Sequence, residues 1–275
     1  MDILIAGYGY VGKALGQKLL SAGHRVYAIK RSPFSNKHIS GIITDLSKPP
    51  LAKLPQVDAV FYLLSADQYS QQAYQSAYVK AQSNLINALI AENKQPKHWV
   101  FASSSHVYNE NHGNWVNEQT PCNPNHFAGK ILLKAENLST ALNCPTTILR
   151  FSGIYGYDRS RIIEDIISNQ VSERWFSNDY ANRIAIEDVV SILLHSLSLQ
   201  DKNSCLIASD GNPFVYKTML KKLTQTLKQD LPSCKKTSTT RVLSNKRLSN
   251  QKLLNTGYRF IVPVFDPLRY HKDKA

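Results

Sequence analysis

The sequence predicts an α/β fold: a doubly wound parallel sheet followed by a small C-terminal lobe. Through residue 151, short apolar runs typical of buried strands alternate with longer stretches whose apolar residues recur at helical spacing. After Phe151 this alternation loosens and the segments become shorter and more irregular. Strands that alternate with helices are typical of a parallel sheet covered by helices on both faces.

The expected strands are short runs of aliphatic and aromatic residues, at 3–6, 25–29, 41–44, 59–64, 98–103, 147–151 and 205–208. The expected helices carry apolar residues three and four positions apart, over 11–23, 72–92, 127–142, 161–169, 187–199 and 215–229. We therefore expect one larger domain over 1–151, to which 183–210 returns, and a lobe made of 152–182 and 211–275.

Composition limits the class of protein. The chain has 275 residues, of which 43% are hydrophobic and 19% charged, enough to bury a core and too apolar for a disordered protein. No apolar run approaches the ~18 residues of a membrane span. The first residues enter a strand-like run without a basic leader. Four cysteines lack metal-ligand spacing: Cys122, Cys144, Cys205 and Cys234. We expect a cytoplasmic protein with reduced thiols and no metal site.

The positive charge is concentrated near the C-terminus. The formal net charge is +13, and residues 217–252 contain ten basic residues and one acid, Asp230. Such a segment attracts anions, among them phosphorylated small molecules and nucleic acids. Because no nucleic-acid recognition motif accompanies it, the sequence favours a solvated basic surface, with nucleic-acid binding as a weaker alternative.

A glycine-rich turn follows the first expected strand. Gly7, Gly9 and Gly12 fit the pattern G-x-G-x-x-G, and Tyr10 and Val11, which stand between the last two glycines, are expected to contact the same ligand. The first glycine permits a tight turn, the second lets a pyrophosphate approach the backbone, and the third lets the helix approach the strand. The helix N-terminus then offers N–H donors to the phosphates. The strand–turn–helix context predicts a Rossmann-type dinucleotide site.

The end of the second expected strand indicates which dinucleotide binds. NAD-specific sites place an acid about 20 residues after the glycines, where it binds the ribose hydroxyls. This chain instead has Lys30, Arg31 and Ser32, and its next acid is Asp45. Two cations and a hydroxyl suit a 2′-phosphate, so the sequence favours NADP, with NAD as the alternative. The other interpretation is that both cations simply point into solvent.

Several motifs, taken in order, resemble the short-chain dehydrogenase/reductase superfamily, on its extended or atypical NAD(P)-dependent epimerase/dehydratase branch. The matching segments are 7–12, 44–46, 103–108, 116–121, 149–156, 183–189 and 245–250. The resemblance covers nearly the whole chain and implies a Rossmann domain and a substrate lobe. It also implies a small-molecule substrate such as a sugar nucleotide, and a homodimer, because dimers are common among relatives.

The resemblance also implies a set of site residues. Catalysis in that family uses Ser, Tyr and Lys; the Ser falls on Ser104 and the Lys on Lys130. The remaining expected coenzyme contacts are Asp45, Leu46, Leu64, Ser65, Ser103, Lys130, Gly153 and Ile154. The expected substrate contacts are Ser105, Arg150 and Arg183, with Arg150 chosen for its charge alone.

The main departure from the family pattern is His126, which stands four residues before Lys130 where the family has Tyr. On one helix this spacing would present both side chains to the same pocket. An imidazole has a reference pKa of ~6.5, so it can exchange protons near neutral pH. We therefore keep two hypotheses open: an NADP-dependent oxidoreductase or epimerase that uses His126 as its acid/base, and a coenzyme-binding sensor that has lost turnover.

Overall fold

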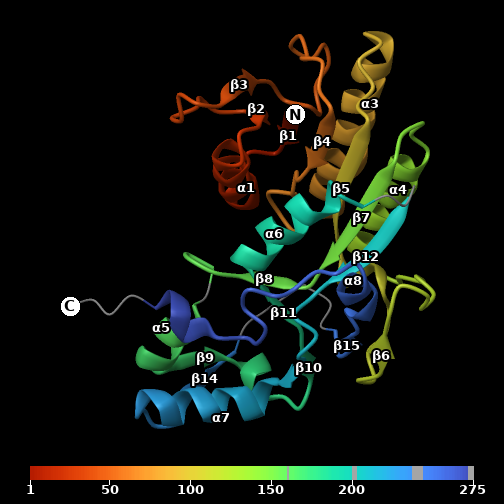
Figure 1. The fold of residues 1–275 in the computed structure, drawn as a ribbon. Coiled ribbons are helices and arrows are strands. Elements are labelled where there is room, and N and C mark those ends of the chain that lie inside the picture. The colour runs from red at the N-terminus through yellow and green to blue at the C-terminus, as the bar shows by residue number, and fades with distance from the viewer. Residues whose placement is uncertain (160, 200–202, 237–243, 272–275) are drawn as a thin grey trace. The chain divides into compact units, whose positions relative to one another are not determined.

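The computed structural model describes residues 1–159, 161–199, 203–236 and 244–271 (Figure 1). The chain divides into two compact units, which we describe separately. Unit 1 consists of Met1–Tyr108, Pro121–Arg150 and Val189–Leu206. Unit 2 consists of Asn109–Thr120, Phe151–Asp188 and Ile207–Ala275. Residues 109–120 thus group with unit 2, whereas the sequence reading assigned them to the larger domain.

Unit 1 is built around the expected parallel sheet. Its seven strands have the order β12-β7-β5-β4-β1-β2-β3. Their bounds are β1 Asp2–Ala6, β2 Arg25–Lys30, β3 Ser40–Ile43, β4 Ala59–Tyr62, β5 His98–Ser104, β7 Thr146–Phe151 and β12 Ser204–Ala208. The first strand pairs in parallel with both β2 and β4. The chain therefore reverses its direction across the sheet at β1, which is where such folds open a crevice for ligands.

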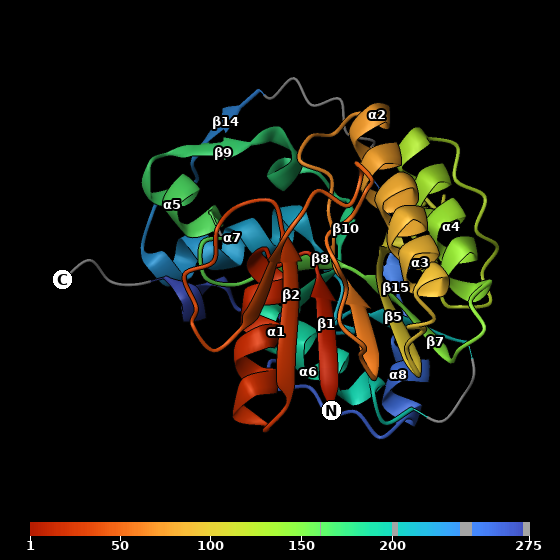
Figure 2. The same cartoon turned by 90° about the horizontal axis from the view of Figure 1, so that it is seen from above.

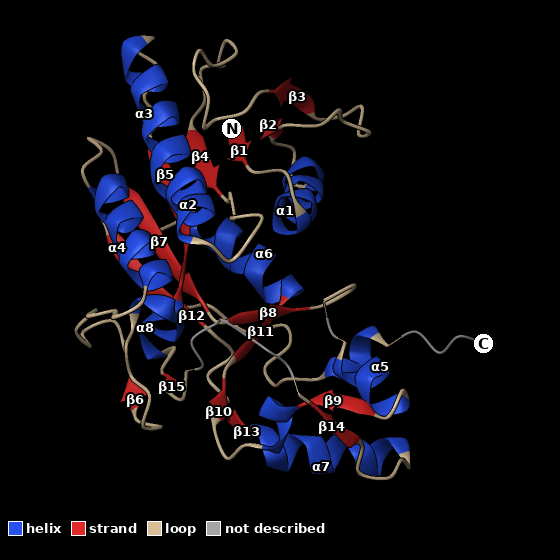
Figure 3. Ribbon diagram, turned by 180° about the vertical axis from the view of Figure 1, so that it is seen from behind, coloured by secondary structure: helices blue, strands red, loops and turns tan. Residues whose placement is uncertain are grey.

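Helices cover both faces of this sheet, which confirms the doubly wound α/β prediction. Their bounds are α1 Tyr10–Ser21, α2 Gln71–Tyr74, α3 Ala81–Ala91, α4 Phe127–Thr140 and α6 Ile186–Ser196. Figure 3 shows α3 and α4 side by side over one face, with α1 on the other, and Figure 2 shows β2, β1 and β5 between these layers. Because both faces are covered, every residue of β4 and β7 is buried.

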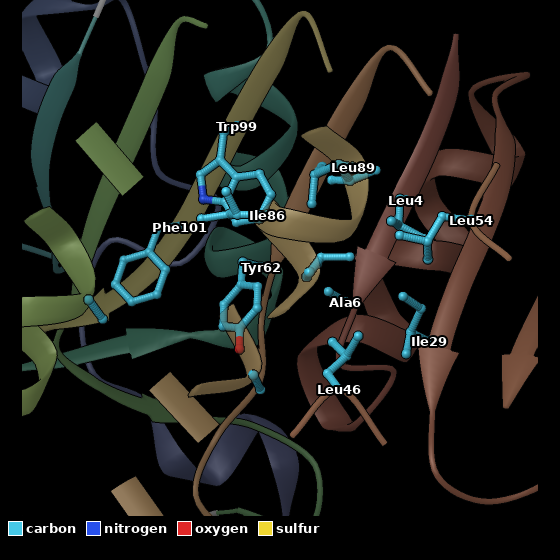
Figure 4. Close-up of a cluster of buried hydrophobic side chains, with 14 of the residues drawn as sticks. Leu4, Ala6, Ile29, Leu46, Leu54, Tyr62, Ile86, Leu89, Trp99 and Phe101 are labelled. Atoms are coloured by element: carbon cyan, nitrogen blue, oxygen red, sulfur yellow. The ribbon is translucent and has the colours of Figure 1, made fainter. Parts of the chain in front are cut away.

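The core of unit 1 lies where β1, β4 and β5 meet α3 (Figure 4). The ring of Tyr62 stacks on those of Trp99 and Phe101, with centroids 5.9 Å away in both cases. Leu85 and Leu89 pack against this group from the helix side. Each such side chain contributes about 1.5–3 kcal/mol when it is fully buried, so this cluster fixes the strand order on which the glycine turn depends.

One turn of π-helix, Gln75–Lys80, joins α2 to α3. The sequence predicted an uninterrupted helix here. The hydroxyl of Tyr62 donates a hydrogen bond of 2.5 Å to the carbonyl of Ala77 within the π turn. The carbonyl of Ala77 in the π turn thus has a hydrogen-bond partner on strand β4. Single π turns inside helices are frequent at functional sites.

Unit 2 is made of paired short strands and short helices. The parallel pairs are β8 Gly153–Tyr155 with β11 Arg183–Ala185, β9 Gln170–Ser172 with β14 Ser233–Lys235, and β6 Trp115–Val116 with β15 Arg247–Leu248. An antiparallel pair joins β10 Tyr180–Ala181 to β13 Phe214–Val215. The helices are α5 Ile162–Ile167, α7 Tyr216–Leu227 and α8 Gln251–Asn255. Among the described residues, the 3-10 turns are Ser105–Val107 in unit 1, and Glu173–Phe176 and Pro267–Tyr270 in unit 2.

A buried carboxylate holds the C-terminal part of unit 2. Asp188 accepts hydrogen bonds from the hydroxyl of Tyr258 and from the backbone N–H groups of Ile261 and Val262, at 2.8 to 2.9 Å. The basic segment 217–252 runs through the same unit, and its Arg241 lies outside the described residues. Among the described residues, none of the helices is long and apolar enough to span a bilayer.

Candidate coenzyme and catalytic site

The glycine turn of unit 1 has the geometry that a dinucleotide requires. Gly7 has a φ of +107°, and a Cβ there would lie 2.7 Å from the backbone nitrogen of Leu64. A Cβ on Gly12 would lie 2.3 Å from the carbonyl oxygen of Gly7. Both positions therefore need glycine. A Cβ on Gly9 would meet no atom within 4 Å, so open space lies against this backbone.

Helix α1 begins directly at this open space. Gly9 is its N-cap and supplies no side-chain acceptor, and the first turn contains no acid. The first N–H groups of the helix and its positive dipole end can therefore serve a bound anion. Tyr10 and Val11 are the first two residues of this helix. These residues fit the pyrophosphate of a nicotinamide coenzyme.

A cavity of about 420 Å³ adjoins the turn, entirely within unit 1. It brings together most of the coenzyme contacts expected from the sequence: Gly7, Gly9, Lys30, Arg31, Ser32, Asp45, Leu46, Leu64 and Ser65. The π turn contributes part of its wall through Ser76 and Ala77. No motif in the sequence pointed to these two residues, because the helical pattern continues through them.

Each charged residue of this cavity has a contact of its own. The Nη2 of Arg31 donates to both carboxylate oxygens of Asp67, at 2.9 and 3.1 Å. The ammonium of Lys30 lies 4.6 Å from the centroid of the Phe34 ring. The Ser47 hydroxyl donates to Asp45 at 2.7 Å, and this hydrogen bond lowers the pKa of the Asp45 carboxyl. The cavity therefore contains both signs of charge.

The catalytic candidates lie at the end of β5 and the start of α4. Ser104 is the last residue of β5, and its Oγ lies 3.0 Å from the Nδ1 of His106. The rings of His106 and His126 meet edge to face, with centroids 6.0 Å apart. Lys130 is exposed in the first turn of α4. The structure thus gathers Ser104 and two imidazoles in unit 1, and the sequence analysis had not singled out His106.

His126 lies just outside the helix on which the sequence reading placed it. It is the N-cap of α4, with extended backbone, and its Nδ1 accepts the backbone N–H of Gly129 at 3.2 Å. While Nδ1 accepts this hydrogen bond it carries no proton, which leaves Nε2 as the ring nitrogen available to hold one. The start of α4 also lies close to the 3-10 turn Ser105–Val107, since a Cβ on Gly129 would lie 2.6 Å from the carbonyl oxygen of His106.

Arg150 and Ser103 are both engaged in a buried network. Arg150 donates from Nε and Nη2 to Glu136, at 3.0 and 2.6 Å, and from Nη1 to the hydroxyl of Tyr108 at 2.8 Å. The Ser103 hydroxyl donates to the same carboxylate at 2.5 Å. Arg150 is only 7% exposed. Both side chains therefore contribute to the packing of unit 1 through Glu136, while the substrate contact of Arg150 and the coenzyme contact of Ser103 stay predictions.

The remaining expected residues are distributed between the units. Ser105 begins the 3-10 turn after β5 in unit 1, whereas Gly153 and Ile154 lie in β8 of unit 2. Arg183 follows in the paired strand β11, and its Nη2 donates to the hydroxyl of Tyr216 at 3.3 Å.

A second guanidinium of unit 2, which the sequence analysis did not single out, lies beside the same phenol ring. The Cζ of Arg174 is 4.8 Å from the centroid of the Tyr216 ring, and that of Arg183 is 5.7 Å from it. Neither guanidinium forms an ion pair with a carboxylate among the residues that the structure describes.

Other proteins share both the sequence pattern and the fold. The profile of the NAD dependent epimerase/dehydratase family matches residues 3–205. A search of curated proteins found no match. Among solved structures, a protein of Methylobacillus flagellatus described as an NAD-dependent epimerase/dehydratase is 28% identical, with a TM-score of 0.74. That alignment covers 96% of this chain and 94% of the other.

Two more distant structures were solved with ligands. MoeE5 in complex with UDP-glucuronic acid and NAD is 22% identical, with a TM-score of 0.82 over 96% of this chain and 95% of that one. A UDP-glucuronic acid 4-epimerase from Bacillus cereus, with UDP-glucuronic acid and NAD, is 18% identical, with a TM-score of 0.79 over 93% and 92%. At these identities the likeness shows the fold. The profile match over most of the chain shows that this protein belongs to the NAD-dependent epimerase/dehydratase family.

Proposed function

We propose that this protein binds NADP(H) in unit 1 and acts as an oxidoreductase or epimerase on a sugar nucleotide or a similar polar carbonyl or alcohol. The observation that carries this proposal is the cavity beside the glycine turn, which is lined by Lys30, Arg31 and Ser32. The open space at Gly9 can receive a pyrophosphate. The three residues after β2 offer two cations and a hydroxyl to a 2′-phosphate.

In this proposal the residues at the end of β5 and the start of α4 bind the substrate oxygen and exchange its proton. When bound, the coenzyme would supply a carbon that accepts or returns a hydride. Ser104 would hydrogen-bond the substrate oxygen whose proton is exchanged. His126, with its Nδ1 occupied by the helix cap, would exchange that proton through Nε2. Lys130, in the first turn of α4, would bind the nicotinamide ribose and stabilise negative charge nearby.

The substrate class is supported by the charge of unit 2. Arg174 and Arg183 both lie against the ring of Tyr216. Guanidinium groups bind phosphate oxygens well, and the aromatic ring keeps both groups in place. We infer that these two residues hold an anionic part of the substrate, such as the diphosphate of a sugar nucleotide. MoeE5, which has a similar fold, was solved with UDP-glucuronic acid.

The rival function is a coenzyme-binding sensor without turnover. The observation that favours it is the hydrogen bond from Gly129 to His126, because helix capping alone would explain the imidazole. In this case coenzyme would bind to unit 1 while no carbonyl or alcohol substrate would be converted.

Thermal unfolding with each coenzyme tests the binding half of the proposal. A ligand at 100 times its dissociation constant stabilises the folded state by about 2.7 kcal/mol, so NADPH should raise the midpoint more than NADH at equal concentration. Gly9→Trp places a large side chain in the open space beside the turn, where a Cβ meets no atom within 4 Å, and serves as the comparison with impaired coenzyme binding. If neither coenzyme shifts the midpoint of the natural chain, the proposal fails. If a coenzyme binds but is neither oxidised nor reduced when UDP-sugars or simple carbonyls are added, the sensor function is supported.

A further inference from the structure

The feature that leads further is the ion pair between Arg31 and Asp67. Asp67, for which the sequence analysis expected no role, follows β4 in the segment before α2. Both carboxylate oxygens of Asp67 accept from one nitrogen, Nη2 of Arg31, at 2.9 and 3.1 Å. Both side chains line the cavity beside the glycine turn.

The strand order explains how these residues meet. β2 and β4 are the two neighbours of β1 in the sheet, and Arg31 and Asp67 follow their carboxyl ends. The glycine turn follows the carboxyl end of β1, between them. The ion pair therefore joins the two sides of the crevice where the coenzyme is expected.

The contact is one that a ligand can replace. The two side chains are 63% and 65% exposed, so water already competes for them and the pair adds little to stability. A phosphate dianion offers a guanidinium the same oxygen acceptors with more charge. Asp67 and a 2′-phosphate therefore compete for Arg31, and a carboxylate near that phosphate also repels it.

We propose that Asp67 sets the coenzyme discrimination of this protein. It holds Arg31 when no phosphate is present and weakens the binding of the 2′-phosphorylated coenzyme relative to NADH. The preference for NADPH is therefore smaller than Lys30, Arg31 and Ser32 would give by themselves. This inference rests on the proposed coenzyme function and adds to it a residue that tunes specificity.

Direct binding measurements with Asp67→Asn test this. The amide keeps the size of the side chain and removes its charge. We expect the dissociation constant of NADPH to fall about threefold and that of NADH to change by less than about twofold. Adenosine 2′,5′-bisphosphate and 5′-AMP, which lack the nicotinamide, should repeat this difference and locate it at the 2′-phosphate.

Two further variants identify the cause. In an Arg31→Ala background, Asp67→Asn should give a smaller gain for NADPH, because the competition for the guanidinium is gone. Asp2→Asn is the control, since Asp2 forms a surface ion pair with Arg25, in which the two side chains are 36% and 68% exposed, at the other end of β1. It should leave both dissociation constants unchanged.

The outcomes separate this inference from the proposed function. An equal change for NADPH and NADH in Asp67→Asn, no change in either, or an undiminished gain in the Arg31→Ala background overturns the role of Asp67. Each of these results leaves coenzyme binding itself intact. If neither coenzyme nor either adenosine fragment binds the natural chain, the proposed function and this inference are both overturned.

Discussion

His126 combines two tasks that separate substitutions can distinguish. Its Nδ1 caps helix α4, and its Nε2 is the nitrogen that we propose for proton exchange. Asn is among the best N-cap residues, whereas Ala cannot cap, and a lost cap costs about 1 kcal/mol. A pair of variants at this one position therefore separates the structural role from the chemical one.

We expect His126→Ala to lower the free energy of unfolding by about 1 kcal/mol, and His126→Asn to leave it close to that of the natural chain. Both variants should lose turnover, because neither carries a group that titrates near neutral pH. Denaturant unfolding and coenzyme oxidation with UDP-sugars provide the two measurements. Turnover that survives in His126→Asn would show that the imidazole serves only as a cap.

The residues that sequence reasoning placed well are those whose reason is local. Gly7 and Gly12 were assigned from spacing, and the structure gives each a steric reason. Arg150 was chosen for its charge, yet its guanidinium is bound by Glu136 from another element. Asp67 carries no local signal at all. The contact partners of Arg150 and Asp67 depend on which elements pack against each other in the fold, and a short sequence motif does not determine this.

At the scale of elements, the seven strands of the parallel sheet were predicted more accurately than the helix interiors, whereas the short paired strands of unit 2 were not predicted. All seven strands of this sheet fall within a few residues of their expected bounds, most of them because a buried parallel strand is a short apolar run; the edge strand β3 is mostly exposed. The helix over 71–91 has an apolar pattern that continues through the π turn at Gln75–Lys80. That turn accompanies a tertiary contact, the hydrogen bond from Tyr62 to Ala77, which periodicity does not encode.

The glycine turn allows a prediction about this connection between β1 and α1. Gly9→Ala should fold with only a small loss of stability: a Cβ there meets nothing within 4 Å, while the backbone, with φ −91° and ψ −147°, lies just beyond the β region that alanine prefers. Its methyl group would occupy the space expected for the pyrophosphate, so coenzyme binding should weaken by about tenfold or more. Gly7→Ala should instead lower stability by a few kcal/mol, because of its positive φ and the nearby Leu64 backbone.

Calorimetric binding and thermal unfolding of the two variants are the measurements for this prediction. Gly23→Ala is the comparison for the backbone effect alone, because it has a φ of +80° with open space around it and lies at the other end of α1. Gly23→Ala should lower the free energy of unfolding and leave the affinity for the coenzyme unchanged. A Gly9→Ala protein that binds NADPH as well as the natural chain would contradict the placement of the pyrophosphate.

At the scale of the whole molecule, electrostatics connects stability to solution conditions. The net charge of +13 is carried in part by α7, where Lys217, Lys221 and Lys222 are exposed opposite the buried Leu220 and Leu223. This amphipathic arrangement is that of a solvated helix face. A positive surface of this kind also attracts anionic ligands from a distance, which suits coenzymes and substrates that carry phosphates.

The pH dependence of stability should reveal a buried acid in unit 2. Asp210 is 5% exposed, and its Oδ2 is buried without a hydrogen-bond partner. Burial raises the pKa of this carboxyl to about 7, although the Asn212 N–H and the charge of Arg183 oppose the shift, and Asp188 adds to it. An unfolded Asp has a pKa of about 3.9. Between about pH 4 and pH 7, the Asp210 carboxyl therefore binds its proton more tightly in the folded state than in the unfolded state.

The sign of the effect follows from this difference. The contribution of Asp210 to stability is complete below about pH 4 and is lost as the pH rises through about 7, which amounts to roughly 2–4 kcal/mol. Asp210→Asn keeps an acceptor for the Asn212 N–H and cannot ionise. We expect its free energy of unfolding to exceed that of the natural chain at pH 8 by far more than at pH 4.5, as measured by denaturant titration at both pH values. A constant difference between the two proteins would mean that the carboxyl is ionised throughout and that Arg183 compensates its charge.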